Sequence, residues 1–238
     1  MNVSGSTALV TGANRGLGRR LVAELLRRGV AKVYAGARDP ATVSPDRDPR
    51  VRVLRLDVTD QAQIDAAAEA APDVTLLVNN AGVLGFGDVL GGDLALAERD
   101  LLTNYLGPLR MARAFLPALK AAGENAAVVN VLTVIALAPV RPMAGYCASK
   151  AAAHSMTQAL RAELRGHGVA VIGAYPGGID TAMLAGVEAV KADPEEVAAR
   201  IVAGIASGEP YVFPDDASAA AGSDHLDSLL RLEGMLTG

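Results

Sequence analysis

Short apolar runs alternate with segments of helical periodicity along the whole chain. Residues 7–11 form an apolar, β-branched run, and in residues 17–28 apolar side chains recur at the three- and four-residue spacing of an amphipathic helix. The same alternation predicts further strands at residues 32–37, 51–56, 75–78, 127–132, 169–175 and 211–213. It predicts further helices at residues 61–71, 101–122, 146–165, 194–206 and 225–236, with Pro108 and Pro117 as kinks or breaks.

This order of elements predicts the fold class. Parallel neighbours need a crossover connection, which is usually a helix, so apolar strands that alternate with helices indicate a parallel sheet covered on both faces. No repeat, low-complexity tract or linker divides the 238 residues. We therefore expect a single domain over residues 1–238, an α/β doubly wound parallel sheet with helices on both faces.

Composition narrows the class of function. Hydrophobic residues make up 51% of the chain, charged residues make up 20%, and the net charge is −4. The chain has no basic face and no basic run, so neither nucleic acid nor an anionic membrane surface is expected as a partner. The most apolar stretch, residues 126–140, contains Asn130, Thr133 and Pro139 and is shorter than the roughly 20 residues of a membrane-spanning helix.

Cysteine and histidine usage carries two further expectations. The single cysteine, Cys147, cannot form an intrachain disulfide and favours a reducing compartment, and the first residues lack the features of a signal peptide. We therefore expect a cytoplasmic protein. No carboxylate or cysteine stands at ligand spacing from His154, His167 or His225, so no metal site is expected.

Glycines cluster where the first predicted strand meets the first predicted helix, in Thr11-Gly12-Ala13-Asn14-Arg15-Gly16-Leu17-Gly18. Glycines let a backbone approach a pyrophosphate, and a helix N-terminus offers free N–H groups and a partial positive charge. With a strand before it and a helix after it, the turn predicts a Rossmann-type dinucleotide site. An ordinary βα turn is the alternative interpretation.

The end of the second predicted strand distinguishes the two nicotinamide dinucleotides. An acidic side chain there would bond a ribose 2′-hydroxyl and repel a 2′-phosphate. The chain has Ala37 followed by Arg38, and Arg15 lies in the glycine turn, so two guanidinium groups suit a 2′-phosphate. We therefore expect NADP(H). The alternative gives the acidic role to Asp39 and leaves Arg38 as a solvated surface charge.

Several motifs resemble those of the classical short-chain dehydrogenase/reductase family, in family order from about Thr7 to Thr181. The spacing of Gly12, Gly16 and Gly18 is similar to the family's cofactor turn, and Asp57 resembles its adenine-contacting aspartate. Asn79-Asn80-Ala81-Gly82 resembles the segment that stabilises the central strand and passes beside the cofactor. Tyr146-Cys147-Ala148-Ser149-Lys150 resembles the YxxxK catalytic motif, and Pro176-Gly177-Gly178-Ile179-Asp180-Thr181 resembles the stretch that lines the nicotinamide.

The resemblance implies a nicotinamide-dependent oxidoreductase with a defined set of cofactor residues. Those from the glycine turn and the first half of the chain are Gly12, Asn14, Arg15, Gly16, Leu17, Gly18, Arg38, Asp57, Val58, Asn79, Ala81 and Gly82. Those from the second half are Asn104, Tyr146, Lys150, Pro176, Gly177, Ile179 and Thr181.

The Tyr146 and Lys150 pair has a chemistry that follows from the residues themselves. A carbonyl that accepts a hydride needs an acid for its developing alkoxide. A phenol with an ordinary pKa of about 10 is a weak acid at neutral pH unless a cation lowers that pKa. Four residues apart, Tyr146 and Lys150 share one helix face, so we expect the ammonium to lower the pKa of Tyr146. The family resemblance also implies that Lys150 holds the nicotinamide ribose.

Thr133 and Asn104 complete the predicted catalytic set, and both depend on the resemblance. The family's serine stands thirteen residues before the tyrosine, and here that position holds Thr133, with Leu132 in place of the usual second serine. Threonine keeps the hydroxyl, but its methyl stiffens χ1 and narrows the pocket. The alternative makes Thr133 a β-branched strand end in an enzyme of altered activity. Asn104 matches the family's helix asparagine, whose distorted backbone holds a water, or else it marks a local kink.

Substrate and assembly follow from the resemblance alone. The segments that line the family's substrate cleft hold Leu137, Pro139, Val140, Met143, Met183 and Leu184. They suggest an apolar or aromatic ketone, aldehyde or quinone, or the matching alcohol, in an open site. A homodimer or homotetramer through residues 101–122 and 146–165 is expected. Two rival functions are a sugar-nucleotide epimerase or dehydratase, which would have a longer C-terminal half, and a non-catalytic NADP sensor or scaffold.

Overall fold

The computed structural model describes residues 1–43 and 48–237, and within them seven parallel strands form one sheet in the order β3-β2-β1-β4-β5-β6-β7. The strands are β1 (Thr7–Thr11), β2 (Lys32–Ala37), β3 (Val51–Arg55), β4 (Leu76–Asn79), β5 (Ala127–Val131), β6 (Ala170–Ala174) and β7 (Tyr211–Val212). The helices are α1 (Gly16–Arg27), α2 (Gln61–Ala70), α3 (Leu94–Leu101), α4 (Gly107–Ala122), α5 (Ala144–Leu164), α6 (Pro194–Ser207) and α7 (Asp216–Thr237).

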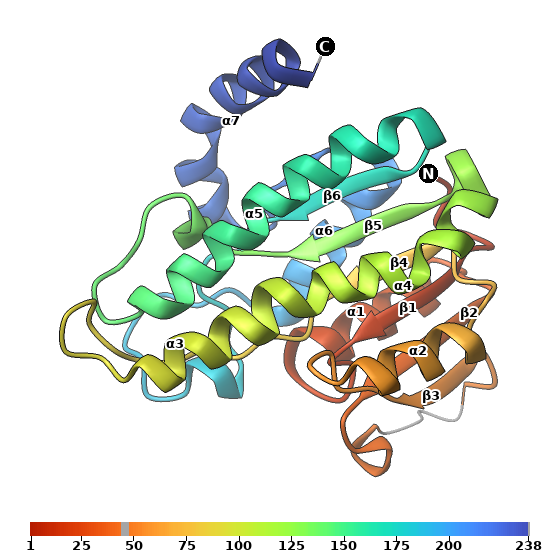
Figure 1. Cartoon of the computed structure of the whole chain (residues 1–238), viewed down its shortest axis with the longest axis horizontal. Helices are drawn as coiled ribbons and strands as arrows, with labels where there is room; N and C mark the ends of the chain where they lie inside the picture. Colours follow the sequence, from red (N-terminus) through yellow and green to blue (C-terminus); the bar gives the residue numbers. More distant parts are fainter. Residues whose placement is uncertain (44–47, 238) are drawn as a thin grey trace.

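Helices cover both faces of the sheet, which confirms the predicted fold class. Helices α2, α4 and α5 lie in front of the strands in Figure 1, and α1 and α6 lie behind them. Successive strand residues face opposite layers, so Val10 packs with α1 and α6 while its neighbour Leu9 packs with α2 and α4. Burial on both faces explains why the strands read as continuous apolar runs rather than alternating ones.

The strand order reverses between β1 and β4, and this reversal positions the site. The chain builds β1, β2 and β3 outward in one direction and then returns to place β4 on the other side of β1. The turns that leave β1 and β4 therefore diverge over opposite faces of the sheet. In open parallel sheets, ligands bind in the crevice at this point, outside the carboxyl ends of the strands.

Two predicted helices have different boundaries in the structure. The prediction that residues 101–122 are mostly helical is confirmed, but the helical run already begins at Leu94 with α3, and a π-helical turn (Leu102–Leu106) separates α3 from α4. Pro108 causes no break: it is the second residue of α4, and the chain is helical on both sides of it. Pro117 does lie inside α4.

The last helix also begins earlier than expected. Helix α7 starts at Asp216 rather than near residue 225, because Asp215 and Ser218 cap its first turn. Its first residues, rich in alanine and serine, carry no clear hydrophobic period that would have revealed them. No helix in the described part of the chain is long and apolar enough to cross a bilayer.

Candidate active site

The turn between β1 and α1 is interlocked with the segment that leaves β4. Gly12 and Gly16 have φ values of +66° and +51°, which side chains rarely adopt, and a Cβ on Gly18 would overlap the Gly12 carbonyl oxygen. Asn80 Nδ2 donates to the Thr11 carbonyl at 2.9 Å, and Thr11 Oγ1 accepts from the Ala81 N–H at 2.9 Å. The turn between β1 and α1 and the segment after β4 are thus held together as one rigid unit at the point where the strand order reverses.

Helix α1 begins directly after the glycine turn, without a capping side chain. Arg15 occupies the N-cap position in extended backbone, and its side chain makes no capping hydrogen bond. Leu17 is buried beneath the turn, so the first turn of α1 is anchored while its N–H groups remain available to an anion. This arrangement fits the pyrophosphate of a dinucleotide.

The end of β2 lies beside the same turn. Asn14 Nδ2 donates to Thr42 Oγ1 at 3.0 Å, which ties the glycine turn to the short helical turn after β2. The side chains of Arg15 and Arg38 are both exposed on this surface. Asp39, the alternative acidic candidate, caps the helical turn by accepting the Ala41 N–H at 3.1 Å. One of its carboxylate oxygens therefore already has a structural partner.

The segment after β3 is shaped by hydrogen bonds and by close packing. Asp57 Oδ1 accepts from both the N–H and the hydroxyl of Thr59, at 2.9 and 2.7 Å. Val58 is buried against the start of α4, where a Cβ on Gly107 would lie 2.9 Å from a Val58 methyl. The Asp57 carboxylate is thus fixed in orientation at the edge of the crevice.

The side chain of Asn79, a predicted cofactor residue, lies inside the sheet. Its Nδ2 donates to Asn130 Oδ1 at 2.9 Å, and Asn130 Nδ2 donates in turn to Thr157 Oγ1. Within the described residues its own Oδ1 has no hydrogen-bond partner although it is buried. The side chain therefore stabilises the centre of the sheet and leaves one acceptor open.

The segment after β6 closes the crevice on the other side. Gly177 N–H donates to Asp215 Oδ2 at 2.8 Å, and Ile179 pairs with Ala192 in an isolated bridge. Thr181 reaches the glycine turn, because a Cβ on Gly16 would lie 3.4 Å from its methyl group. The structure thus brings the segment that starts at the buried Pro176 over the start of α1.

Tyr146 and Lys150 lie on the first turns of α5, and both are buried. Lys150 Nζ donates to the Val131 carbonyl at 2.8 Å, which fixes the amine at the end of β5, two residues before Thr133. The same Nζ lies 5.9 Å from the centroid of the Tyr146 ring. A Cβ on Gly82 would lie 3.7 Å from Lys150 Nζ, so the pair adjoins the segment that leaves β4.

Burial shifts the pKa values of Tyr146 and Lys150, and the pKa of Tyr146 moves up rather than down as the sequence had suggested. Burial raises the pKa of Tyr146, and the nearby Cys147 and Asp100 raise it further, so the expected lowering by Lys150 is absent from the structure. Burial also lowers the pKa of Lys150 to about 8. In a dry site the phenol is held protonated, and the amine is the group that titrates near neutral pH.

Asn104 connects the π-helical turn to both the loop after β4 and helix α5. Its Nδ2 donates to the Val83 carbonyl and to Ser149 Oγ, both at 2.9 Å, and its Oδ1 accepts the Val83 N–H at 2.9 Å. The π-helical turn is the backbone distortion that the sequence predicted here. The side chain of Asn104 thus holds the loop after β4 and also Ser149, the residue of α5 next to Lys150.

Thr133 follows β5 with 6% of its surface exposed. Its Oγ1 accepts a long hydrogen bond of 3.4 Å from the Ile135 N–H, so the hydroxyl proton remains available to an acceptor. Exposed apolar side chains also occur on the loops that follow β4, β5 and β6, among them Phe86, Val140 and Met183.

The short chain dehydrogenase family model matches residues 6–192, which include every one of these segments except Asp215. The chain belongs to this family. It is 34% identical over 207 residues to the short chain dehydrogenase tazN of Aspergillus terreus, covering 80% of this chain and 44% of that protein. The chain thus spans less than half the length of that relative.

Solved short-chain dehydrogenases share the whole architecture. One from Burkholderia cenocepacia, in complex with NADP, is 40% identical, with a TM-score of 0.90 and full coverage of both chains. The 3-ketoacyl-(acyl-carrier-protein) reductase of Brucella melitensis, complexed with NADH, is 25% identical, with a TM-score of 0.81 over 89% of this chain and 97% of its own. Such neighbours support a nicotinamide dinucleotide as cofactor, in either form.

Sequence reasoning missed three polar residues that build this short-chain dehydrogenase site. Asp215 holds Gly177, Ser149 joins Asn104 to α5, and Asp100 lies fully buried one helical turn before Asn104. Nothing in the sequence marks Asp215. No group of three or more potential metal ligands occurs within the described residues.

Proposed function

We propose that this short-chain dehydrogenase is an NADP(H)-dependent oxidoreductase that reduces an apolar ketone, aldehyde or quinone to the alcohol, or catalyses the reverse. The observation that carries the proposal is the position of Lys150. Its amine is bonded to the end of β5 and adjoins Gly82, so one group lies between the predicted acid, Tyr146, and the predicted cofactor crevice. Bound in that crevice, the dinucleotide would supply or accept the hydride.

The roles of the side chains follow from their acidities and contacts. Burial keeps the phenol of Tyr146 protonated, and Tyr146 donates this proton to the alkoxide as the carbonyl is reduced. Thr133 donates a hydrogen bond to the same substrate oxygen. Lys150 keeps two N–H donors beyond its bond to Val131, and these would hold the ribose and stabilise the tyrosinate that forms. Asn104 supports the loop, and its π-helical turn supplies the place for a relay water.

The proposed cofactor residues keep the assignments made from sequence. The glycine turn and the first turn of α1 would bind the pyrophosphate, and Asp57 with Val58 would border the adenine. Ala81, Gly82 and the segment from Pro176 to Thr181 would enclose the nicotinamide half. The oligomeric state, expected to be a homodimer or homotetramer, and the cytoplasmic location remain predictions.

Cofactor preference gives a first prediction. Because Arg15 and Arg38 are exposed beside the turn and Ala37 offers no carboxylate, NADPH should bind at least about tenfold more tightly than NADH, or about 1.4 kcal/mol. Arg38→Asp should shrink or reverse that ratio, since a carboxylate repels a 2′-phosphate. Dissociation constants from NAD(P)H fluorescence measure it, with Arg52→Asp as the matched control at another exposed arginine. Equal affinities in the unmodified protein would contradict the proposal.

The pH dependence of cofactor binding gives a second prediction. The pKa of Lys150 is about 8, so its amine is charged below that pH and becomes neutral as the pH rises through it. NADPH affinity should therefore fall between about pH 7 and pH 9. Lys150→Ala should bind weakly with no such dependence and should lose turnover as well. A flat affinity profile in the unmodified protein would remove Lys150 from ribose binding.

A turnover assay tests the function itself. NADPH oxidation is measured against a panel of aldehydes, ketones and quinones that differ in apolar area, with NADP⁺ reduction by the matching alcohols. The exposed apolar side chains of Phe86, Val140 and Met183 favour larger apolar members of the panel. Tight NADPH binding without turnover of any substrate would favour the non-catalytic sensor or scaffold instead.

A further inference from the structure

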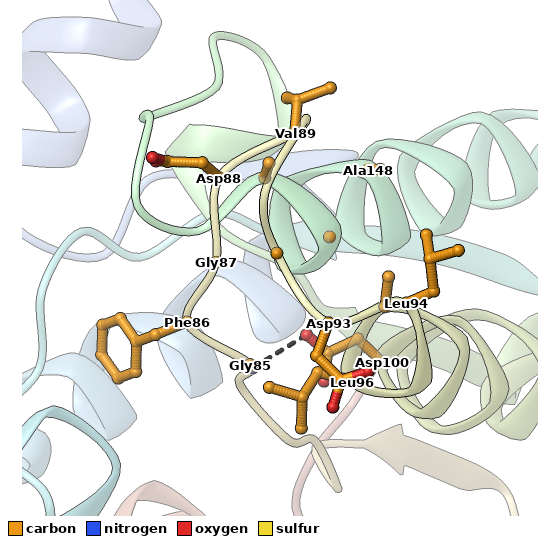
Figure 2. A pocket seen from close by; sticks show the side chains of 14 residues that line it. Gly85, Phe86, Gly87, Asp88, Val89, Asp93, Leu94, Leu96, Asp100 and Ala148 are labelled. Carbon is orange, nitrogen blue, oxygen red and sulfur yellow. Dashed lines mark hydrogen bonds between the residues drawn. The ribbon is translucent and has the colours of Figure 1, made fainter.

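Asp100 is a fully buried carboxylate in α3 that the proposed chemistry does not use. It lies at a pocket of about 240 Å³ between the loop of residues 85–93, helix α3 and the start of α5 (Figure 2). None of the four candidate catalytic residues lines this pocket. A buried carboxylate is costly unless it is paired, so its retention calls for an explanation in its surroundings.

The carboxylate of Asp100 fixes the loop that leaves β4. Its Oδ2 accepts the Gly85 N–H at 2.8 Å, the bond dashed in Figure 2, and its Oδ1 accepts from Arg99 Nη2 at 3.0 Å. A side chain at Gly85 would be tightly crowded, because a Cβ there would lie 3.0 Å from Asp100 Oδ2 and 3.0 Å from Leu96 Cβ. The loop backbone therefore lies directly on α3.

The same loop is bonded to the start of the helix that carries Tyr146. Gly87 N–H donates to the Pro142 carbonyl at 2.9 Å, and Ala144 N–H donates to the Gly87 carbonyl at 3.2 Å. Helices α3 and α5 also touch directly, because a Cβ on Gly145 would lie 2.9 Å from the Ala97 Cβ. Asp100, the loop and the first turn of α5 thus form one packed unit.

Within this unit Asp100 acts electrostatically on both members of the catalytic pair. It opposes the burial that lowers the pKa of Lys150, and it raises the pKa of Tyr146. Among the described residues, other titratable groups that face the unit are Arg99 from α3, Cys147 from α5, Asp88 and Asp93 at the rim of the pocket, and Arg141, which is ion-paired with Asp88. Arg99, Asp88 and Asp93 are exposed to water, whereas Asp100 is buried and has the Arg99 guanidinium as its ion-pair partner.

We propose that Asp100 is a positioning residue, whose buried carboxylate fixes Gly85 against α3 and keeps the Lys150 amine charged at neutral pH. The proposal rests on the proposed function, since the charge matters only if Lys150 serves the cofactor and Tyr146. With a pKa of about 8, Lys150 is about nine-tenths charged at pH 7. Without the Asp100 charge, a large part of that ammonium would be lost at the same pH.

Direct titration of Lys150 tests the charge and needs no turnover. The chain has four lysines, so protein labelled with ¹³C-lysine should give four resolvable signals, with Lys150 assigned by its absence in Lys150→Arg. Asp100→Asn retains an oxygen for Gly85 but removes the charge, and it should lower the Lys150 pKa by about one unit. Asp88→Asn, at the exposed rim of the same pocket, is the matched control and should leave it unchanged. An unchanged Lys150 pKa in Asp100→Asn overturns the proposal.

A second pair of measurements separates the charge from the loop contact. Asp100→Ala should also increase hydrogen exchange at the Gly85 amide, whereas Asp100→Asn should leave that exchange nearly as slow as in the unmodified protein. If Asp100→Asn does not fold, Asp100→Ser supplies a smaller neutral side chain, with the same downward shift expected. Should the unmodified protein turn over no substrate, the proposed function fails, yet the lysine titration still decides the role of Asp100.

Discussion

Tyr146→Phe is expected to lower kcat by up to about 10⁴-fold, to near the background rate. The substitution removes only the phenolic hydroxyl, and burial holds that hydroxyl protonated at neutral pH, ready to donate. The ring remains to pack at the start of α5, so NADPH affinity should stay within about twofold of the unmodified protein. Steady-state kinetics on the best substrate of the panel, with fluorescence titration of NADPH, measure both effects.

A second tyrosine provides the control for this experiment. Tyr34 carries its hydroxyl on β2, bonded to Asp73 at 2.8 Å and outside the candidate site, so Tyr34→Phe should leave kcat unchanged. Both variants keep the ring and lose one hydroxyl, which makes the comparison a test of position. Near-normal turnover by Tyr146→Phe would mean that another group supplies the proton.

Thr133→Val is expected to lower kcat by about 10²-fold or more. Valine keeps the size and the β-branching of threonine but cannot donate a hydrogen bond to the developing alkoxide. The lost contact with the Ile135 N–H is 3.4 Å long, so it should contribute little to stability. Thr133→Ser, which keeps the hydroxyl and loses the methyl group, should retain activity and turn over bulkier substrates faster.

Stability measurements keep this comparison interpretable. The melting temperatures of both Thr133 variants should lie close to that of the unmodified protein, because the side chain sits at the end of β5 and not in its interior. If a stably folded Thr133→Val turned over substrate at the original rate, Thr133 would have no part in the reaction. The alternative of a β-branched strand end would then be correct.

The elements that the sequence predicts well are those whose signal is local. All strands except the edge strand β3, which alternates with exposed arginines, are apolar runs buried on both faces, and α1 and α6 carry a clear hydrophobic face. The boundaries of these elements therefore fall within one or two residues of the prediction. The glycine turn is equally local, since its positive φ values require glycine at Gly12 and Gly16. Thus the sheet, its helices and the crevice could be inferred before any coordinates.

The features that sequence reasoning missed depend on contacts between distant segments. Helix α3 packs on α5 through Ala97, a contact with no signature within its own eight residues, although its N-cap, Asp93, is a helix-start signal that the prediction did not use. The acidity of Tyr146 was predicted from its spacing to Lys150, but the burial that opposes this effect comes from elements packed around both. Burial of Asp100 likewise results from the loop at Gly85, fifteen residues earlier.

The bonds that join the loop of residues 85–93 to the start of α5 have a consequence for how enzymes of this design diversify. This loop is tied to the helix of the proposed proton donor and cannot move outward without displacing Tyr146, because Gly87 is bonded to the residues on both sides of Met143. The segment after β6 is less constrained. Its exposed residues are Ala185, Gly186 and 188–190, and the segment is held mainly at its ends, where the Ala192 N–H donates to the Gly178 carbonyl. Libraries that alter substrate size should therefore vary residues 185–190 and leave Gly85 and Gly87 untouched.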